Sequence, residues 1–267
     1  MKRYKVIQSG KVVKDYFNPY ERKGQAFQVV HFEYEGRTYV MADTFMNGRI
    51  RSTFFSKFGA DSREYQFRDL IKKFNAKVPY PVYNIGSAKD CPSLESGECL
   101  VGEGDCYAWH DENMYKTPLY YRRRQEIFWR NNTTEEMAQL LLDHIGKVKA
   151  LRFNESGDFR TLSDVVKMDK VAMYLGYYGV KCYVFTARRN LGIEQPHYAW
   201  SRKHITIIGS RIAGLDGQFN MSHDAKADVR QARALGFRAI VCPNDCSKCS
   251  VCPNQKTNPT IIFGQKH

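Results

Sequence analysis

Residues 150–186 read ALRFNESGDFRTLSDVVKMDKVAMYLGYYGVKCYVFT, and this stretch predicts the fold. Its two ends, ALRFNE and VKCYVFT, are short apolar runs of the kind that form buried strands. The segment 162–179 between them has helical periodicity and ends at Gly179, a common helix C-terminal signal. A strand, a helix and a second strand in this order predict a βαβ unit with parallel strands.

The same alternation continues on both sides of this unit. Further strands are predicted at 81–86, 204–209, 237–242 and 260–263, and further helices at 134–145 and 224–235. Right-handed crossovers would roll such a sheet into a barrel. We therefore expect residues 79–267 to form an α/β domain, a partial or full TIM-like (β/α) barrel that contains two groups of cysteines.

Residues 1–78 are expected to form a separate, small α+β unit. Residues 26–42 predict a β-hairpin with its turn at Glu35 and Gly36, and residues 61–75 predict a helix capped by Asp61 or Ser62. Prolines near residue 80 make a plausible joint to the larger domain. This N-terminal unit is strongly basic, with 16 Lys and Arg against 8 Asp and Glu.

The composition points to a soluble chain with a polyanionic partner. The 267 residues are 43% hydrophobic, but no stretch approaches the roughly 20 apolar residues of a membrane helix. There is no secretory signal, so we expect a cytoplasmic protein with free thiols. The net charge of +13 favours nucleic acid as the partner, and a generic basic surface is the alternative.

Seven of the eight cysteines fall into two groups. The upstream group is spaced C-x7-C-x6-C and comprises Cys91, Cys99 and Cys106. The tail group is spaced C-x3-C-x2-C-x2-C and comprises Cys242, Cys246, Cys249 and Cys252. Thiolates two residues apart can turn their sulfurs to one point, as metal ligation requires. Cys182 lies within an apolar strand and is predicted to be a core residue.

An iron–sulfur cluster, of the 4Fe-4S type, is the favoured metal centre. The C-x2-C-x2-C spacing of the tail group is that of bacterial ferredoxins. The upstream group also favours a cluster, because its three thiolates would leave one iron open for a substrate or cofactor, whereas structural zinc requires four ligands. Four thiolates also suit a closed structural Zn²⁺ site, which is the alternative. The sequence leaves open whether the two groups form one site or two.

Polar residues follow the predicted strands at their carboxyl ends, where active sites of such folds lie. We predict a catalytic set and a cofactor-binding set at this edge. The catalytic set is Glu155, Asp158, Arg188 and Arg211. The cofactor-binding set is Ser156, Gly157, Thr186 and Ser210. For Asp158 the alternative is a helix N-cap.

An aromatic and basic cluster follows the upstream cysteines. It comprises Tyr120, Tyr121, Arg122, Arg123 and Arg124. Arginines next to tyrosines can bind phosphates and stack on bases, so we predict a nucleic-acid-binding patch. The alternative is an ordinary solvated helix face.

Several of these strings together resemble a known family. They are Cys91-Pro92, Cys99, Cys106-Tyr107-Ala108, Ser156-Gly157-Asp158-Phe159, Tyr183–Arg188, Cys246-x2-Cys249-x2-Cys252 and Phe263 to His267. Over about residues 80–267 the chain resembles the phage "gene 88 protein" family, which is similar in outline to radical S-adenosylmethionine (SAM) enzymes with a three-cysteine cluster on a partial TIM barrel. The resemblance implies a phage or prophage source, hence the host cytoplasm, and a barrel.

The resemblance supplies no established reaction. The C-x7-C-x6-C spacing of the upstream group is looser than the usual C-x3-C-x2-C of radical SAM enzymes, and no Gly-Gly-Glu-type SAM motif is evident. SAM is therefore a doubtful cofactor. The leading hypothesis is an iron–sulfur protein that acts on nucleic acid, by modification of a base or of the backbone. The alternatives are a non-catalytic nucleic-acid-binding protein stapled by structural zinc, and a redox or SAM-type enzyme on a small metabolite.

Overall fold

The computed structural model describes residues 11–15, 27–34, 37–46, 49–52, 71, 78–99 and 106–265. These residues form two separate sheets, one of four strands near the N-terminus and one of seven strands in the rest of the chain. No helix in the described ranges is long and apolar enough to cross a membrane.

The N-terminal sheet has the strand order β1-β2-β3-β4 and is antiparallel throughout. Its strands are β1 (Lys11–Asp15), β2 (Phe27–Tyr34), β3 (Arg37–Met46) and β4 (Arg49–Ser52). The predicted hairpin is confirmed, because β2 and β3 pair antiparallel with Tyr34 opposite Arg37. Of the helix predicted at 61–75, all but residue 71 lies outside the described residues.

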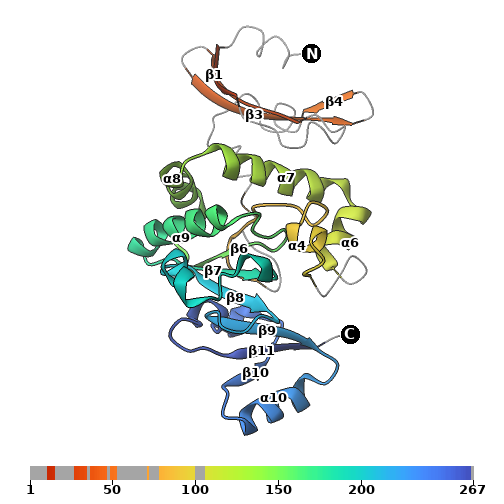
Figure 1. Cartoon of the computed structure of the whole chain (residues 1–267). Coiled ribbons are helices and arrows are strands. Elements are labelled where there is room, and N and C mark those ends of the chain that lie inside the picture. Colours follow the sequence, from red (N-terminus) through yellow and green to blue (C-terminus); the bar gives the residue numbers. More distant parts are fainter. Residues whose placement is uncertain are drawn as a thin grey trace.

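The seven-stranded sheet has the order β10-β11-β9-β8-β7-β6-β5, and every neighbouring pair is parallel (Figure 1). Its strands are β5 (Val82–Tyr83), β6 (Ala150–Phe153), β7 (Lys181–Thr186), β8 (Thr206–Ser210), β9 (Gly217–Ser222), β10 (Ala239–Val241) and β11 (Ile261–Gln265). The predicted α/β fold with a parallel sheet is therefore confirmed.

Of the partial or full TIM-like barrel that was expected, the full, closed barrel is not formed. The terminal strands β5 and β10 lie at opposite ends of the strand order and do not pair, so the sheet is open. The regular order from β5 to β9 is broken at its end, where β11 inserts between β9 and β10. The last strand of the chain therefore lies inside β10 in the strand order, whereas in a TIM barrel each strand pairs with the next strand along the chain.

Local signals set the boundaries of the main helices. Helix α8 (Thr134–Ile145) begins with a capping box, in which the backbone N–H of Glu136 donates to Thr133 Oγ1 and that of Thr133 donates to the Glu136 carboxylate. Helix α9 (Leu162–Tyr177) is followed by Gly179 with a φ of 76°. Helix α10 (Ala225–Ala234) begins at Asp224, which caps it. All three helices were predicted.

Other elements carry weaker sequence signals and were not predicted. They include the helices α4 (Pro92–Glu95), α6 (Tyr107–Met114) and α7 (Lys116–Asn131), and the strands β1, β4 and β9. The residues of β9, GQFNMS, contain no apolar run, but their backbone pairs with β8 on one side and β11 on the other. The short alternation of polar and apolar residues from Gln218 to Ser222 is consistent with this strand, and pairing on both sides supports it.

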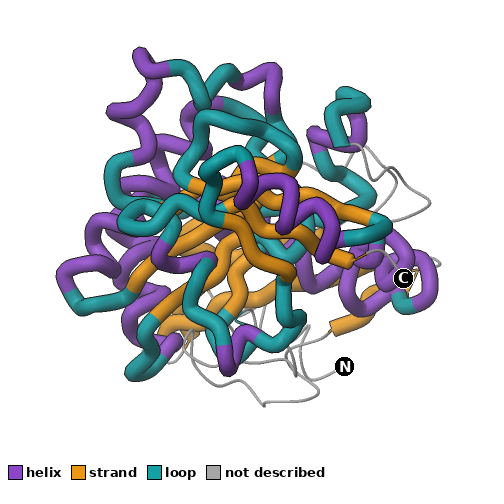
Figure 2. Tube along the Cα trace, turned by 90° about the horizontal axis from the view of Figure 1, so that it is seen from below, coloured by secondary structure: helices purple, strands orange, loops and turns teal. Residues whose placement is uncertain are grey.

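The two faces of the large sheet are covered differently, and Figure 2 shows the strands between helices and loops. On one face, here the helix face, Leu151, Phe153 and Val184 belong to a core that includes buried residues of α7, α8 and α9. The opposite face, here the tail face, carries Tyr183, with Phe185 packed beside it. Residues of the segment 242–260 pack over this tail face.

Candidate functional site

The predicted site residues follow strands of one parallel sheet, so they lie along a single edge, the carboxyl edge. Glu155 and Asp158 come after β6, Arg188 comes after β7, and Arg211 comes after β8. Because all seven strands point the same way, the side chains at their ends share this edge. Their contacts decide which of them are free to meet a ligand.

Asp158 is buried and its carboxylate is fully engaged. It accepts hydrogen bonds from Ser93 Oγ (2.6 Å), Thr186 Oγ1 (2.7 Å) and the backbone N–H groups of Phe159 and Ala187 (both 2.8 Å). Burial raises the pKa of Asp158, and the four donors oppose this shift. The carboxylate thus connects α4 to the loops that follow β6 and β7.

Two asparagines that the sequence reasoning missed shape the same edge. Asn84 Oδ1 accepts hydrogen bonds from the backbone N–H groups of Glu155 (2.8 Å) and Ser156 (3.0 Å), and Asn154 Oδ1 accepts one from that of Ile85 (3.1 Å). The loops after β5 and β6 therefore hold each other by reciprocal contacts. The only sequence signal was a polar residue directly after each apolar run.

Gly157 allows these loops to approach closely. Its φ is +75°, and an added Cβ would lie 2.7 Å from the carbonyl carbon and oxygen of Gly86. Neither the backbone angle nor the space would accept a side chain. The predicted importance of Gly157 thus has a structural reason that needs no bound cofactor.

The predicted nucleic-acid patch is largely internal. Arg122 and Arg123 are only 4% and 5% exposed. Arg122 pairs with Glu112 at 2.8 Å, and Arg123 donates two hydrogen bonds to Asp90 at 2.6 and 2.9 Å. These two guanidinium groups bind carboxylates and do not face solvent, contrary to the predicted role. The reason is that α6 and the loop after β5 bring buried acids to the same helix face.

Of the other three residues in that patch, Tyr121 packs against the main core. The side chains of Tyr120 and Arg124 lie outside the described residues.

The two predicted catalytic arginines differ in environment. Arg188 is 7% exposed and pairs with Glu98 at 3.3 Å, while its Nε also donates to Asn190 Oδ1 at 3.0 Å. Arg211 is exposed, has a φ of 58°, and reaches only the backbone carbonyl of Met221. The structure therefore does not bring Arg188 and Arg211 together around Asp158.

The upstream cysteines lie above the carboxyl edge. Cys91 and Cys106 are the N-cap residues of α4 and α6, and Cys99 is an electrostatic neighbour of both. Burial raises the pKa of Cys91 to about 12, and the charge of Asp158 adds to the effect. Burial also raises the pKa of Cys106. These thiols are partly exposed and unpaired.

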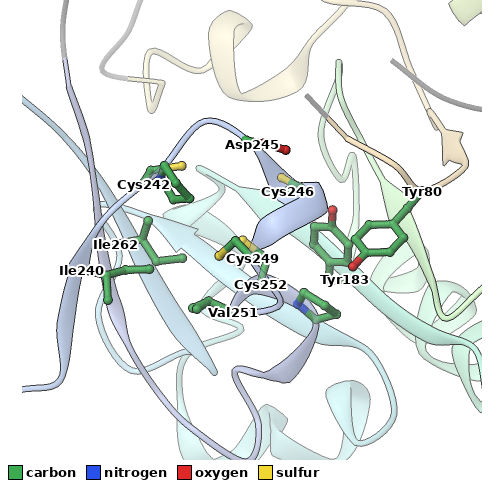
Figure 3. Close-up of a pocket in the computed structure, with 12 residues that line it drawn as sticks. Tyr80, Tyr183, Ile240, Cys242, Asp245, Cys246, Cys249, Val251, Cys252 and Ile262 are labelled. Carbon is green, nitrogen blue, oxygen red and sulfur yellow. The ribbon is translucent and has the colours of Figure 1, made fainter. Parts of the chain in front are cut away.

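The tail cysteines surround a small cavity of about 20 Å³ on the tail face. Figure 3 shows all four of them around it, with the rings of Tyr80 and Tyr183 on one side and the side chains of Ile240 and Ile262 on the other. Side chains alternate between the two faces along β10 and β11. Ile240 and Ile262 therefore line the cavity, whereas Val241 and Phe263 lie on the other face and pack with residues of α10.

The tail thiols interact with one another. Burial raises the pKa of Cys252 to about 12, and the nearby thiols of Cys246, Cys242 and Cys249 raise it further. The pKa of Cys246 is likewise raised by burial and by Cys242 and Cys249. All eight cysteines are free thiols. The thiol–thiol interactions of Cys91 and Cys106 involve Cys99, and those of Cys246 and Cys252 involve other tail cysteines.

Arg152 is a second feature of the tail face that the sequence reasoning missed. Its side chain is half-buried, its Nε is buried without a hydrogen-bond partner, and its guanidinium lies 5.3 Å from the centre of the Phe185 ring. Its electrostatic neighbours are, in falling order of effect, Tyr107, Tyr183, Glu155 and Cys252. Arg152 therefore places a positive charge beside the tail thiols.

The geometry for metal binding is incomplete. Among the described residues, no group of three or more histidine, cysteine, aspartate or glutamate side chains is arranged so that it could hold a metal ion. The donor set itself fits thiolate ligation, because four free thiols line one cavity. Ligation would require the segment 242–252 to draw its sulfurs together, as is usual when metal binding and folding are coupled.

Comparison with known proteins gives no match, whether to family models, to curated proteins or to solved structures. The resemblance to the gene 88 proteins therefore rests on the sequence strings alone.

Proposed function

We propose that the four tail cysteines ligate an iron–sulfur cluster, and that the protein acts on nucleic acid. The observation that carries the first part is that Cys242, Cys246, Cys249 and Cys252 line a single cavity on one face of the sheet. Zinc ligated by the same thiols is the alternative. The net charge of +13 supports a polyanionic partner.

The surroundings of the cavity suit a thiolate-bound cluster. Tyr80, Tyr183, Ile240 and Ile262 form largely apolar walls, which limit the access of water to a metal centre. Four consecutive ligands within one short segment also favour a cluster over zinc, because the C-x2-C-x2-C spacing is that of cluster-binding loops. The free thiols fit a reducing compartment such as the cytoplasm.

The positive charge of Arg152 is a second reason to propose a thiolate-bound metal centre in this cavity. A cluster or a zinc ion with four thiolate ligands carries net negative charge, and Arg152 lies beside Cys252 with its Nε unsatisfied. In the described part of the chain Arg152 forms no ion pair with a carboxylate. A bound thiolate centre would neutralise this charge, which otherwise stays partly desolvated.

The centre would also hold the end of the sheet together. The segment 242–260 leaves β10 at the carboxyl edge, crosses the tail face and enters β11. Its short helix η5 (Cys252–Asn254) contacts β7 and β8. A metal bound here would therefore contribute to the stability of four strands.

The test is the metal content of protein purified without oxygen. We expect a brown protein with absorbance at about 400 nm and about four iron and four sulfide per chain. Cys249→Ser should remove most of the iron, whereas Cys182→Ala, which changes a buried thiol on the helix face, should leave it in place. A colourless protein with about one zinc per chain would contradict the cluster and support the zinc alternative. A stable protein without metal would contradict both proposals.

A further inference from the structure

The edge of the sheet opposite the predicted active site is basic. Lys149 directly precedes β6, Lys181 is the first residue of β7, and Lys203 and His204 precede β8. All four side chains are exposed. The strands are parallel and adjacent, so their starts lie side by side; the backbone N–H of Lys181 donates to the carbonyl of Lys149. We call this the amino edge.

An open groove of about 480 Å³ runs along the amino edge. Its walls come from the end of α9, the starts of β7 and β8, and the segment 253–257, and include Tyr177, Lys181, His204 and Lys256. None of the described residues that line it is an aspartate or glutamate. The groove is therefore positively charged and large enough for a nucleotide.

The groove is held in shape by contacts with the tail segment. Lys181 donates a hydrogen bond to Asn254 Oδ1. Lys256 donates to the carbonyl of Arg202 and pairs with Asp216 at 3.1 Å. Asp216 is shared with Arg202 at 3.4 Å, and the buried carboxylate of Asp169 accepts hydrogen bonds from the backbone N–H groups of His204 and Ile205. Two carboxylates thus lie among four cations, Lys181, Arg202, Lys203 and Lys256, and the local charge stays positive.

Two tyrosines stand in solvent at the end of α9. Tyr177, which lines the groove, is 80% exposed, and Tyr178 is 73% exposed. Exposed hydrophobic side chains occur elsewhere on the described surface, so it is the position of the Tyr177 ring beside Lys181 in the groove that bears on binding. A ring beside a row of lysines is the combination that binds single-stranded nucleic acid, with phosphates on the cations and a base stacked on the ring.

We propose that the amino edge and its groove bind single-stranded nucleic acid, with Lys181 and Tyr177 of the groove on a phosphate and under a base, and with Lys203 and Lys149, which lie on the same edge outside the groove, on the neighbouring phosphates. An acidic peptide would use the same cations, but it has no aromatic base to cover Tyr177. This inference rests on the nucleic-acid partner proposed above. It moves the binding surface away from Arg122 and Arg123, whose side chains are buried in ion pairs.

The test is fluorescence anisotropy with fluorescein-labelled single-stranded oligo(dT) and oligo(U), over a series of salt concentrations. Lys181→Gln combined with Lys203→Gln should weaken binding and reduce the slope of log Kd against log salt by about 1.4, since each single-strand phosphate contact contributes about 0.7. The matched control removes the same charge from exposed positions on α10, through Lys226→Gln with Arg230→Gln, and should leave the slope near that of the wild type.

Stacking is tested separately at Tyr177. Tyr177→Ala should weaken binding by about 5- to 100-fold, whereas Tyr177→Phe, which keeps the ring, should bind like the wild type. If the wild type binds neither oligonucleotide at low salt, the proposed partner fails. If it binds but the groove variants match the α10 control, the proposed groove fails while the partner survives. Equal competition by poly-glutamate would assign the groove to an acidic protein and overturn the proposal.

Discussion

The carboxylate of Asp158, in the loop after β6, accepts a 2.7 Å hydrogen bond from the hydroxyl of Thr186 at the end of β7. Both residues were predicted at an active edge, Asp158 as a catalytic group and Thr186 as a cofactor ligand. Ser93, Phe159 and Ala187 supply three further hydrogen bonds to the carboxylate. This set of contacts makes Asp158 a positioning residue that holds two loops and α4 in place.

Replacement of Asp158 by alanine should therefore destabilise the fold. The change leaves two hydroxyls and two backbone N–H groups without their acceptor, and we expect a loss of about 3–5 kcal/mol in the free energy of unfolding, measured by urea denaturation. Asp143→Ala, at an exposed site on α8, should change it by less than about 0.5 kcal/mol. A variant Asp158→Ala with unchanged stability would favour a catalytic role for this aspartate.

Gly157→Ala should be far more damaging than Gly179→Ala. Both glycines have a positive φ, +75° and +76°, so the two variants share the same backbone strain of about 1 kcal/mol. They differ in space, because a Cβ at Gly157 would meet the Gly86 backbone at 2.7 Å, whereas nothing lies within 4 Å of one at Gly179. Similar midpoints of thermal unfolding for the two variants would show that the loops after β5 and β6 can separate.

Arg123→Met should destabilise the protein and leave nucleic-acid binding unchanged in the molecules that remain folded. The change removes the guanidinium partner of the buried carboxylate of Asp90, which keeps a hydrogen bond from Ser87 Oγ, and loss of one partner of a buried ion pair costs about 3–5 kcal/mol. Arg230→Met, at an exposed site on α10, is the control and should cost less than about 0.5 kcal/mol. A stable Arg123→Met protein with a flatter salt dependence of binding would restore the phosphate-binding role first predicted for this arginine.

Arg152→Gln should lower the reduction potential of the proposed cluster. Removal of a positive charge beside Cys252 makes the addition of an electron less favourable, by an amount on the order of tens of mV. Spectroelectrochemical titration of the holoprotein measures this shift, and Arg230→Gln, which changes an exposed arginine on α10, serves as the control. An equal potential in wild type and Arg152→Gln would mean that Arg152 does not face the metal centre.

The parts of the fold that the sequence predicted are those with local signals. The capping box at Thr133 and the apolar periodicity of 162–177 define α8 and α9 before any long-range contact is known. Strand β9 was missed although Gln218–Ser222 alternate polar and apolar residues, because this alternation is short and contains only two apolar side chains, Phe219 and Met221. Its pairing with β8 and β11 makes the strand evident. The position of β11 between β9 and β10 likewise depends on contacts between segments that are distant in the sequence, and local residue patterns do not predict it.

By itself, the sequence determined that the chain alternates strands and helices and that the tail holds four closely spaced thiols. Periodicity and spacing are properties of neighbouring residues, so they can be read without knowing the fold. Only the tertiary structure decided which charges are free. Arg123 looked like a surface residue until the fold placed Asp90 beside it, and Lys181 and Lys203 came together because parallel strands start at the same edge. Charge pairing acts across space between distant segments, and a charge is available to a partner only where the fold has left it unpaired in solvent.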